Sequence, residues 1–569
     1  MDRSNARVSI RGLFSHKALL GSASVLAAVL MGAASPVLAE ATTSVPNEGS
    51  ASEKAQGGWQ ARVRIEGLER SQVMGFVTQL ADGIGPRLTG SPGMARSYEW
   101  SLETLSALGL ENPRLEPIDM AVIGWRQTHA SVRMVEPEPM VFLAQAGAWS
   151  VATPGVVEGE VVAVSLRTDE DLAANRGRLG GKIVLLGPLR PVPPTDRPQT
   201  VRYSEAEILS GEINEPVRET FRTMEARRAG QAQAGLFAAR LRAFLEAEGV
   251  KAVLLPSRDG AHGGGSGNLS IDEGPFSVRS WSAVERPSFP FVYAAIEHFG
   301  RAWRLAQGDR PVRLEVRLDV EETPGPEPVY NVVADLPGQD PELRPQIVLA
   351  GAHLDSWASG TGALDNATGV AAVLEAVRIL KASGYQPRRT IRVVLFGAEE
   401  QGLHGSLAYA KRHLGAYPRA VTPDQLALSA EGRRTRTGPL QTLPDYDDFS
   451  IAYNMDAGSG RIRGVYAGGN PQLAALYRSW IEPLKDLGVI AVYDEPFWPA
   501  DQSTFSDIGL PGIMFLHDPL DYFTRARHSN LDTLERVSPE DMAQISTVLA
   551  TFLGRSAETD ALAPRPPLP

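Results

Sequence analysis

Two kinds of apolar run alternate along the last 240 residues of the chain. Short and almost continuous apolar runs, typical of buried strands, occur at 329–336, 346–354, 390–398, 449–457 and 512–518. Between them, at 366–383 and 470–488, apolar residues recur at three- and four-residue steps, which is typical of helices. This alternation predicts an α/β fold with a mostly parallel central sheet flanked by helices.

The first part of the chain has a different pattern of apolar and polar residues. Two helices are predicted at 70–84 and 93–110, and short β-like runs follow, interrupted by one long polar helical stretch. We interpret the segment with the short β-like runs as a β-rich domain inserted into the main domain. The expected division is a main-domain part at 61–123, an inserted domain at 124–320, the rest of the main domain at 321–556 and a flexible tail at 557–569.

The N-terminus has the layout of a secretory signal peptide. Four basic residues precede an apolar run at 18–34, and the small residue Ala39, in SPVLAEA, provides the kind of site after which signal peptidases cut. We expect residues 1–39 to be removed and the polar residues 40–60 to form a flexible linker. The mature protein is then expected to be periplasmic or secreted, without a membrane segment.

The charge and the cysteine content exclude several kinds of function and site. The formal net charge is −11, so there is no electrostatic reason to bind nucleic acid. The chain has no cysteine, which excludes disulfides, thiol nucleophiles and thiolate metal sites. Strong metal ligands must therefore come from His, Asp and Glu.

Several of these residues follow predicted strands. His353 and Asp355 end one strand, Glu399 and Glu400 follow the next, and Asp456 follows a third. The carboxyl ends of parallel strands meet at one edge of a sheet, so these side chains are expected to share a cleft. Asp365, which opens a helix, and His528, further along the chain, are candidates for the same site.

Each residue alone also has a structural interpretation. An Asp at a helix start is commonly a cap, and paired glutamates usually lie on solvated surfaces. The recurrence of such residues at strand ends favours a metal site. Neighbouring Glu399 and Glu400 point in different directions, so one can bind metal while the other takes a proton.

Together, these residues and their motifs resemble the co-catalytic zinc peptidases of the leucyl aminopeptidase and glutamate carboxypeptidase type. The motifs are GAHLDSW, GALDNATGVAAVLEAVR, RRTIRVVLFGAEEQGLHGS, NMDAG and RHSNLDT, in that order. HLDSW, AEEQG and DYFTRARHSNLDT are most similar to the plasma glutamate carboxypeptidase (carboxypeptidase Q) branch. The inserted segment resembles a protease-associated domain on weaker motifs.

The resemblance implies a site with two Zn²⁺ ions. His353 and Asp456 would hold one ion, Glu400 and His528 the other, and Asp365 would bridge them. Glu399 matches the general base, and Asp355 matches the carboxylate that orients His353. The implied function is hydrolysis of dipeptides or short peptides by a metal-activated water.

Alternatives remain open at this stage. An aminopeptidase acting on longer peptides, a glutaminyl cyclase-type acyl transferase and a non-catalytic binding protein could share the fold. Some relatives stabilise the oxyanion with a tyrosine just before the last histidine ligand, where this chain has Arg527. Tyr522 and His517 are weak candidates for that role. A homodimer is also possible. The native metal can differ from zinc, since carboxylate-rich sites accept other divalent ions.

Overall fold

The computed structural model describes residues 51–566, apart from 190, 191, 193–197, 199, 258–266, 272–274, 277, 278 and 429. The expected signal peptide and residues 40–50 of the expected linker lie outside the described residues. Helix α1 (Ala51–Leu68) begins inside the segment expected to be a linker. Residues from Lys54 onward form one compact unit.

The main part of the protein is built on a parallel sheet. Strands β16 (Gly512–Ile513), β13 (Phe449–Asn454), β9 (Ile347–His353) and β10 (Thr390–Phe396) run parallel in this order, and β8 (Arg313–Leu336) pairs antiparallel with β10. Helices cover both faces, so the strands are apolar without interruption. The α/β fold predicted from the alternation of runs is confirmed.

Helices divide between the two faces of this sheet. Val348 of β9 and Val393 of β10 point to a core shared with α9 (Thr368–Ala382) and α14 (Pro539–Glu558). Leu349 and Val394, one residue further along each strand, point to a second core with α10 (His404–His413) and α13 (Asp501–Asp507). The alternation follows from the two-residue period of a strand.

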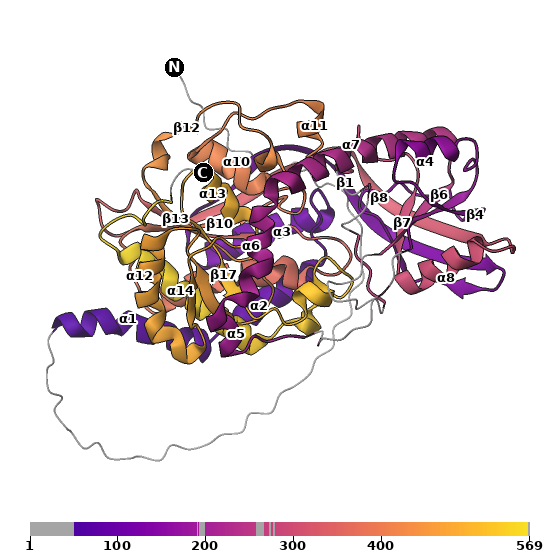
Figure 1. Cartoon of the computed structure of the whole chain (residues 1–569). Coiled ribbons are helices and arrows are strands. Elements are labelled where there is room, and N and C mark those ends of the chain that lie inside the picture. The colour runs from indigo at the N-terminus through magenta and orange to yellow at the C-terminus, as the bar shows by residue number, and fades with distance from the viewer. Residues whose placement is uncertain are drawn as a thin grey trace, which may run out of the picture. The chain divides into compact units, whose positions relative to one another are not determined.

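Two long strands extend the sheet beyond the main part. β1 (Glu111–Glu136) pairs antiparallel with β8 along most of its length. The sheet continues from β8 through β4 (Val157–Ser165), β5 (Ile183–Gly187), β6 (Ala252–Pro256), β7 (Phe291–Ala294) and β3 (Ala144–Ala146). Figure 1 shows this extension with α4 (Asp169–Ala174), α7 (Met224–Glu248) and α8 (Ile296–Ala306) around it. Its buried apolar side chains form a cluster that also includes Leu88, Trp357 and Ala398 of the main part.

One stretch of the inserted segment packs against the main part. Helices α5 (Glu205–Ser210) and α6 (Glu215–Arg222) lie beside a small sheet of β15 (Ala491–Tyr493), β14 (Ile462–Tyr466) and β17 (Phe515–His517). The Tyr493 hydroxyl donates to the carbonyl of Ile208 at 2.7 Å, and Arg218 pairs with Glu495 at 2.8 Å. α7 then leads from this contact into the inserted segment (Figure 1).

The remaining helices and strands are short or peripheral: α2 (Val73–Thr78), η2 (Gln79–Ile84), α3 (Pro92–Ala107), β2 (Met140–Val141), η3 (Glu212–Asn214), β11 (Gly415–Ala416), α11 (Pro423–Leu426), η5 (Glu431–Arg433), β12 (Gln441–Thr442), η6 (Pro444–Tyr446), α12 (Pro471–Ile481), η7 (Glu482–Leu487) and η9 (Leu534–Arg536). Residues 559–566, in the expected flexible tail, contact the main part: the amide of Ala563 donates to the Ser450 hydroxyl at 3.2 Å.

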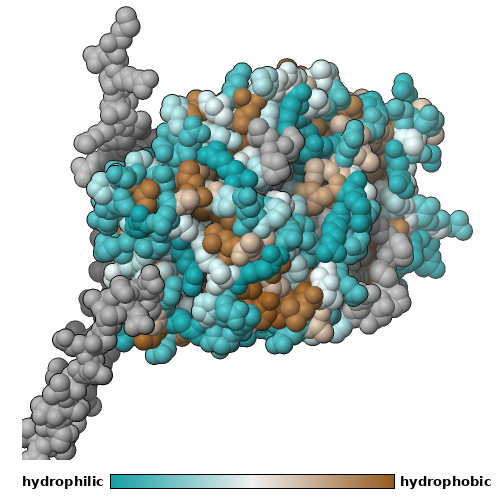
Figure 2. Space-filling model, turned by 60° about the vertical axis from the view of Figure 1, so that its left-hand side comes forward, coloured by the Kyte–Doolittle hydropathy of each residue, from teal (hydrophilic) through white to brown (hydrophobic). Residues whose placement is uncertain are grey.

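The surface is mainly polar on the face that Figure 2 shows, with apolar residues in small groups. Among the described residues, every helix is too short or too polar to span a lipid bilayer.

Candidate metal centre

The predicted site residues converge at the carboxyl edge of the main sheet. His353 is the last residue of β9, Glu399 and Glu400 follow β10, and Asp456 follows β13. Asp365 lies in η4 (Ala363–Ala367), directly before α9. His528 follows η8 (Tyr522–Ala526) and reaches the same edge from a loop.

Asp365 lies between the two histidines. Its Oδ1 is 3.1 Å from His353 Nε2, and its Oδ2 is 3.1 Å from His528 Nε2. Asp456 Oδ1 is 3.5 Å from His353 Nε2, and Glu400 Oε2 is 3.0 Å from His528 Nε2. The structure therefore contains two groups of ligand atoms that share one carboxylate.

The spacing and chemistry of these atoms fit divalent metal ions. Two ligands that each lie about 2.0–2.1 Å from a tetrahedral zinc are roughly 3.3 Å apart, close to the separations here. Ligand atoms of His353, Asp365 and Glu400 all lie within 4.8 Å of one another. Oε1 of Glu400 is buried and has no hydrogen-bond partner, and an acceptor in that state is costly unless a cation satisfies it.

His353 is oriented for metal binding through its other ring nitrogen. Nδ1 lies 3.0 Å from the carbonyl oxygen of Asp355, to which an Nδ1–H donates, leaving the Nε2 lone pair toward the site. Burial lowers the pKa of His353, but Asp456, Asp355 and Asp365 outweigh it and hold the pKa well above its usual range. A site this rich in carboxylates attracts either a proton or a metal cation.

Asp355 contributes its side chain to a different contact. The carboxylate is completely buried and accepts from the amides of Glu399 at 3.1 Å and Glu400 at 3.2 Å. Its Oδ1 is 3.8 Å from His353 Nδ1, further than its own backbone carbonyl. Asp355 therefore positions His353 through the main chain and the two glutamates through the carboxylate.

The backbone around the glutamates and His528 is constrained. Ala398 (φ 55°) and His528 (φ 57°) both adopt the left-handed conformation, which is uncommon for residues other than glycine. Residues held in such conformations cluster at functional sites. Burial and the charges of Asp456 and Glu400, opposed by His353, raise the pKa of Glu399 well above its usual range.

Arg87, which the sequence analysis did not single out, lies behind the site. It is completely buried and donates to four backbone carbonyls: Leu354 at 2.8 Å, Gly362 at 2.8 Å, Thr361 at 3.0 Å and Gly85 at 3.2 Å. Burial lowers its pKa to about 10, against the opposing charges of Asp532, Asp355 and Asp365. Arg87 thus ties together the loops that carry His353 and Asp365.

Two further residues support the ligands. Asp532 is buried and accepts from the amides of Leu364 at 2.5 Å and Asp365 at 3.3 Å. Trp357 donates its indole N–H to Glu400 Oε2 at 2.7 Å. Trp357 belongs to the motif HLDSW and Asp532 to the motif RHSNLDT. Their proximity to proposed ligands in the sequence was a signal that could have identified them.

The two oxyanion candidates occupy different surroundings. Burial raises the pKa of Tyr522 well above its usual value, and the charges of Asp365 and Asp456 add to this. The Nδ1–H of His517 donates to the carbonyl of Gly460 at 2.8 Å, and burial lowers the pKa of His517 to about 4.

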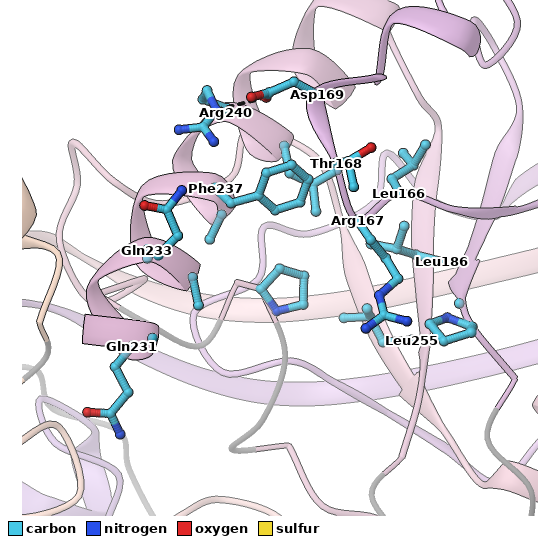
Figure 3. A pocket seen from close by; sticks show the side chains of 18 of the residues that line it. Leu166, Arg167, Thr168, Asp169, Leu186, Gln231, Gln233, Phe237, Arg240 and Leu255 are labelled. Atoms are coloured by element: carbon cyan, nitrogen blue, oxygen red, sulfur yellow. Dashed lines mark hydrogen bonds and ion pairs between the residues drawn. The ribbon is translucent and has the colours of Figure 1, made fainter. Parts of the chain in front are cut away.

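A large cavity lies away from these ligands, in the inserted segment. It encloses about 930 Å³ between α7 and the carboxyl ends of β4, β5 and β6, with Leu186, Leu255 and Phe237 among its lining residues. Figure 3 shows Arg240, Phe237, Gln233 and Gln231 following one another along α7 beside it. None of the predicted ligands lines this cavity.

Comparisons with known proteins identify the region that carries the site. Residues 331–553 match the sequence profile of Peptidase family M28. The chain is 25% identical to carboxypeptidase Q of Bos taurus over 493 residues, which is 85% of each chain.

Solved structures show the same fold. A peptidase M28 precursor from Shewanella amazonensis SB2B has a TM-score of 0.60 at 24% identity, over 89% of this chain and 98% of that one. BSAP, a zinc aminopeptidase from Bacillus subtilis, has a TM-score of 0.52 at 17% identity, over 86% and 95%. The resemblance inferred from the five motifs is confirmed.

Proposed function

We propose, from the match of residues 331–553 to Peptidase family M28, that the chain is an exported dinuclear zinc exopeptidase of dipeptides or short peptides. The observation that carries the proposal is the position of Asp365, with one carboxylate oxygen 3.1 Å from each of two histidine Nε2 atoms. A carboxylate in this position can bind two cations at once. His353 and Asp456 would complete one metal site, and Glu400 and His528 the other.

The bound zinc ions would supply Lewis acidity, polarising the scissile carbonyl and lowering the pKa of a water to about 7. Glu399 is proposed as the general base that takes the proton from this water and returns it to the leaving amine. The amide of Glu399 donates to the Asp355 carboxylate. Oε2 of Glu400, the next residue, accepts from the Trp357 indole and lies beside His528 Nε2. Adjacent carboxylates are thereby separated into a ligand and a base.

Short peptides are proposed as substrates because the similarity to carboxypeptidase Q covers most of the chain, inserted segment included. The second candidate is an aminopeptidase, because the structurally similar Bacillus subtilis protein is a zinc aminopeptidase. We also propose that residues 124–320 form a protease-associated-like domain, because most members of one hydrophobic cluster lie in this segment and β1 and β8 join it to the main part.

Hydrolysis assays would test the proposal. Zinc-loaded wild type and Glu399→Gln would be compared on a free dipeptide, its N-acetyl derivative and a leucine anilide, with exposed Glu535→Gln as control. We expect the free dipeptide to be cleaved, E399Q to lose about 10²–10⁴-fold in kcat with its zinc retained, and E535Q to match wild type. Preferred cleavage of the anilide would favour the aminopeptidase. Wild type inactive on all three substrates would contradict the peptidase proposal.

Export is a separate part of the proposal and rests on the pattern of residues 1–39. Expression of the full chain in a bacterium with a periplasm would test it. N-terminal sequencing of the periplasmic protein is expected to begin at Glu40. Recovery of the uncleaved chain only in the cytoplasm would contradict this part and leave the enzymatic proposal intact.

A further inference from the structure

A short loop of the main part, at 357–359 between β9 and η4, contacts two of the proposed ligands. The Trp357 indole donates to Glu400 Oε2 at 2.7 Å. The Ser359 hydroxyl donates to the carbonyl oxygen of His528 at 3.1 Å. The two ligands proposed for one zinc ion are therefore both held by this loop.

The inserted segment supports the same loop. Gln145 of β3 donates its side-chain N–H to the carbonyl of Ala358 at 2.7 Å. The completely buried Trp149 packs edge-to-face on Trp357, with the two ring centroids 6.3 Å apart. Trp281, also from the inserted segment, packs on Trp149 at a centroid distance of 6.2 Å. The position of the loop therefore depends on side chains of the inserted segment.

A second contact of the inserted segment reaches the residues that follow His528. Ser529 pairs with Ser270 in an antiparallel β-bridge. The amide of Asn530 donates to the carbonyl of Leu269 at 2.9 Å, and Asn530 Oδ1 accepts from the amide of Leu269 at 2.7 Å. The inserted segment thus pairs with the loop that carries His528 as a neighbouring strand would.

The residues that make this second contact are anchored to the rest of the inserted segment. The amide of Ser270 donates to the hydroxyl of Ser257, which directly follows β6, at 2.8 Å. The amide of Gly267 donates to Glu297 of α8 at 3.0 Å, and its carbonyl accepts from Asn530 Nδ2 at 3.2 Å. A shift of the inserted segment would therefore be transmitted to the loop.

The other half of the proposed metal centre is supported differently. His353 is the last residue of β9, and the amide of Met455, which precedes Asp456, donates to the carbonyl of Gly351 in β9 at 2.9 Å. These ligands are therefore held by the parallel sheet. His528 instead lies in a loop with φ 57°, a conformation that persists only when the surrounding structure fixes it.

We propose that the inserted segment positions Glu400 and His528, so that the zinc ion bound by this pair is held tightly only while the inserted segment is docked. The inference rests on the proposed dinuclear centre and adds that its two zinc sites have different supports. Gln145 and Asn530 are the positioning residues, since each acts on a ligand through the loop beside it. Partners of metal ligands typically contribute about 10–100-fold to metal affinity.

Two variants with matched controls would test these contacts. Asn530→Ala removes the side-chain bonds to the inserted segment, and Gln145→Ala removes the bond to Ala358. The controls are Asn175→Ala and Gln307→Ala, because these side chains donate to backbone carbonyls within the inserted segment. Urea unfolding of the metal-free proteins would identify any variant that has lost its fold.

Zinc binding, measured in competition with a chelator, is the main readout. In N530A and Q145A we expect one zinc ion to keep its wild-type affinity and the other to bind about 10–100-fold more weakly. Anomalous diffraction at limiting zinc should show that the weakened ion is the one beside Glu400 and His528. Peptidase activity should recover at high free zinc, because the variants retain every ligand, and both controls should match wild type.

Linkage provides a second readout that needs no catalysis. If docking favours zinc at Glu400 and His528, zinc at this pair favours docking by the same factor. Amide hydrogen exchange at Leu269, whose N–H donates to Asn530, is therefore expected to slow in wild type when the second zinc ion binds. An exchange rate that does not respond to this zinc ion would contradict the coupling.

The zinc measurements separate a failure of this inference from a failure of the proposed function. Equal weakening of both zinc ions in N530A and Q145A, or of neither, would overturn the inference and leave the dinuclear centre intact. Selective loss of the ion beside His353 and Asp456 would overturn it as well. A wild type that binds fewer than two zinc ions would contradict the dinuclear proposal, and this inference would fail with it.

Discussion

At the scale of single residues, Asp365 determines what the site can do. Its two oxygens lie at equal distances from the Nε2 atoms of His353 and His528. Of the other proposed ligands, Asp456 pairs with His353 at 3.5 Å and Glu400 pairs with His528 at 3.0 Å. Loss of charge at Asp365 would therefore affect both groups of ligands, whereas loss at Asp456 or Glu400 would affect one.

Asp365→Asn tests this directly. An amide keeps the size of the side chain but offers one neutral oxygen, so we expect zinc occupancy to fall at both sites. Activity should fall by more than the ~10–100-fold that loss of an outer-shell partner costs. Elemental analysis of the dialysed protein would measure the metal, with exposed Asp494→Asn as control. A variant that keeps full zinc content and activity would contradict the bridging role.

At the scale of elements, Arg87 holds two loops that end at the site. Its guanidinium donates to carbonyls on both loops, at Leu354 and at Thr361 and Gly362. The buried side chain thus keeps the segment after β9 next to the segment before α9.

Arg87→Gln should destabilise the protein by at least about 3 kcal/mol, since several buried acceptors lose their donor. Urea unfolding of the metal-free protein would measure the change. The control is Arg96→Gln, because Arg96 is exposed and donates to a single carbonyl, Ile84, at 2.9 Å; its loss should cost less than about 1 kcal/mol. Similar losses in the two variants would argue against the role of Arg87.

The contact between α10 and β1 gives a pH-dependent prediction. Glu116 of β1 is buried and accepts from His413 Nε2, at the end of α10, at 2.8 Å. Burial alone would raise the pKa of Glu116, but His413 and Arg114 lower it to about 2. A carboxyl whose pKa is depressed on folding stabilises the protein above its unfolded pKa, and this stability is lost as pH falls through the folded value.

The contribution of Glu116 should therefore be complete near pH 5.5 and should decline between about pH 4.5 and pH 2. At pH 5.5 we expect Glu116→Gln to unfold with about 1–3 kcal/mol less free energy than wild type, and this difference should shrink toward pH 3. Exposed Glu321→Gln, which loses its pair with Arg126, should show little change. A difference that stays constant with pH would contradict the low pKa.

At the scale of the whole molecule, the sequence predicted the parts of the fold that follow a period. Buried parallel strands are continuous apolar runs, so β9, β10 and β13 were recognisable. The proposed ligand His353 is the last residue of β9, and Glu400 lies shortly after β10. Arg87 follows no period. It acts through contacts between segments more than 200 residues apart, such as the one with Gly362, and one sequence does not show which segments meet.

The inserted segment shows the same limit. Its strands were predicted from their apolar runs, but the packing of α5 and α6 against the main part was not. That packing rests on isolated contacts such as Tyr493 with Ile208 and Arg218 with Glu495.

The most direct test of the account is a crystal structure of the zinc-loaded protein with anomalous diffraction recorded at the zinc edge. We predict two anomalous peaks on opposite sides of the Asp365 carboxylate, one beside His353 and Asp456 and the other beside Glu400 and His528. A single peak, or zinc bound elsewhere with these residues left without metal, would contradict the two-metal centre on which the proposed hydrolysis rests.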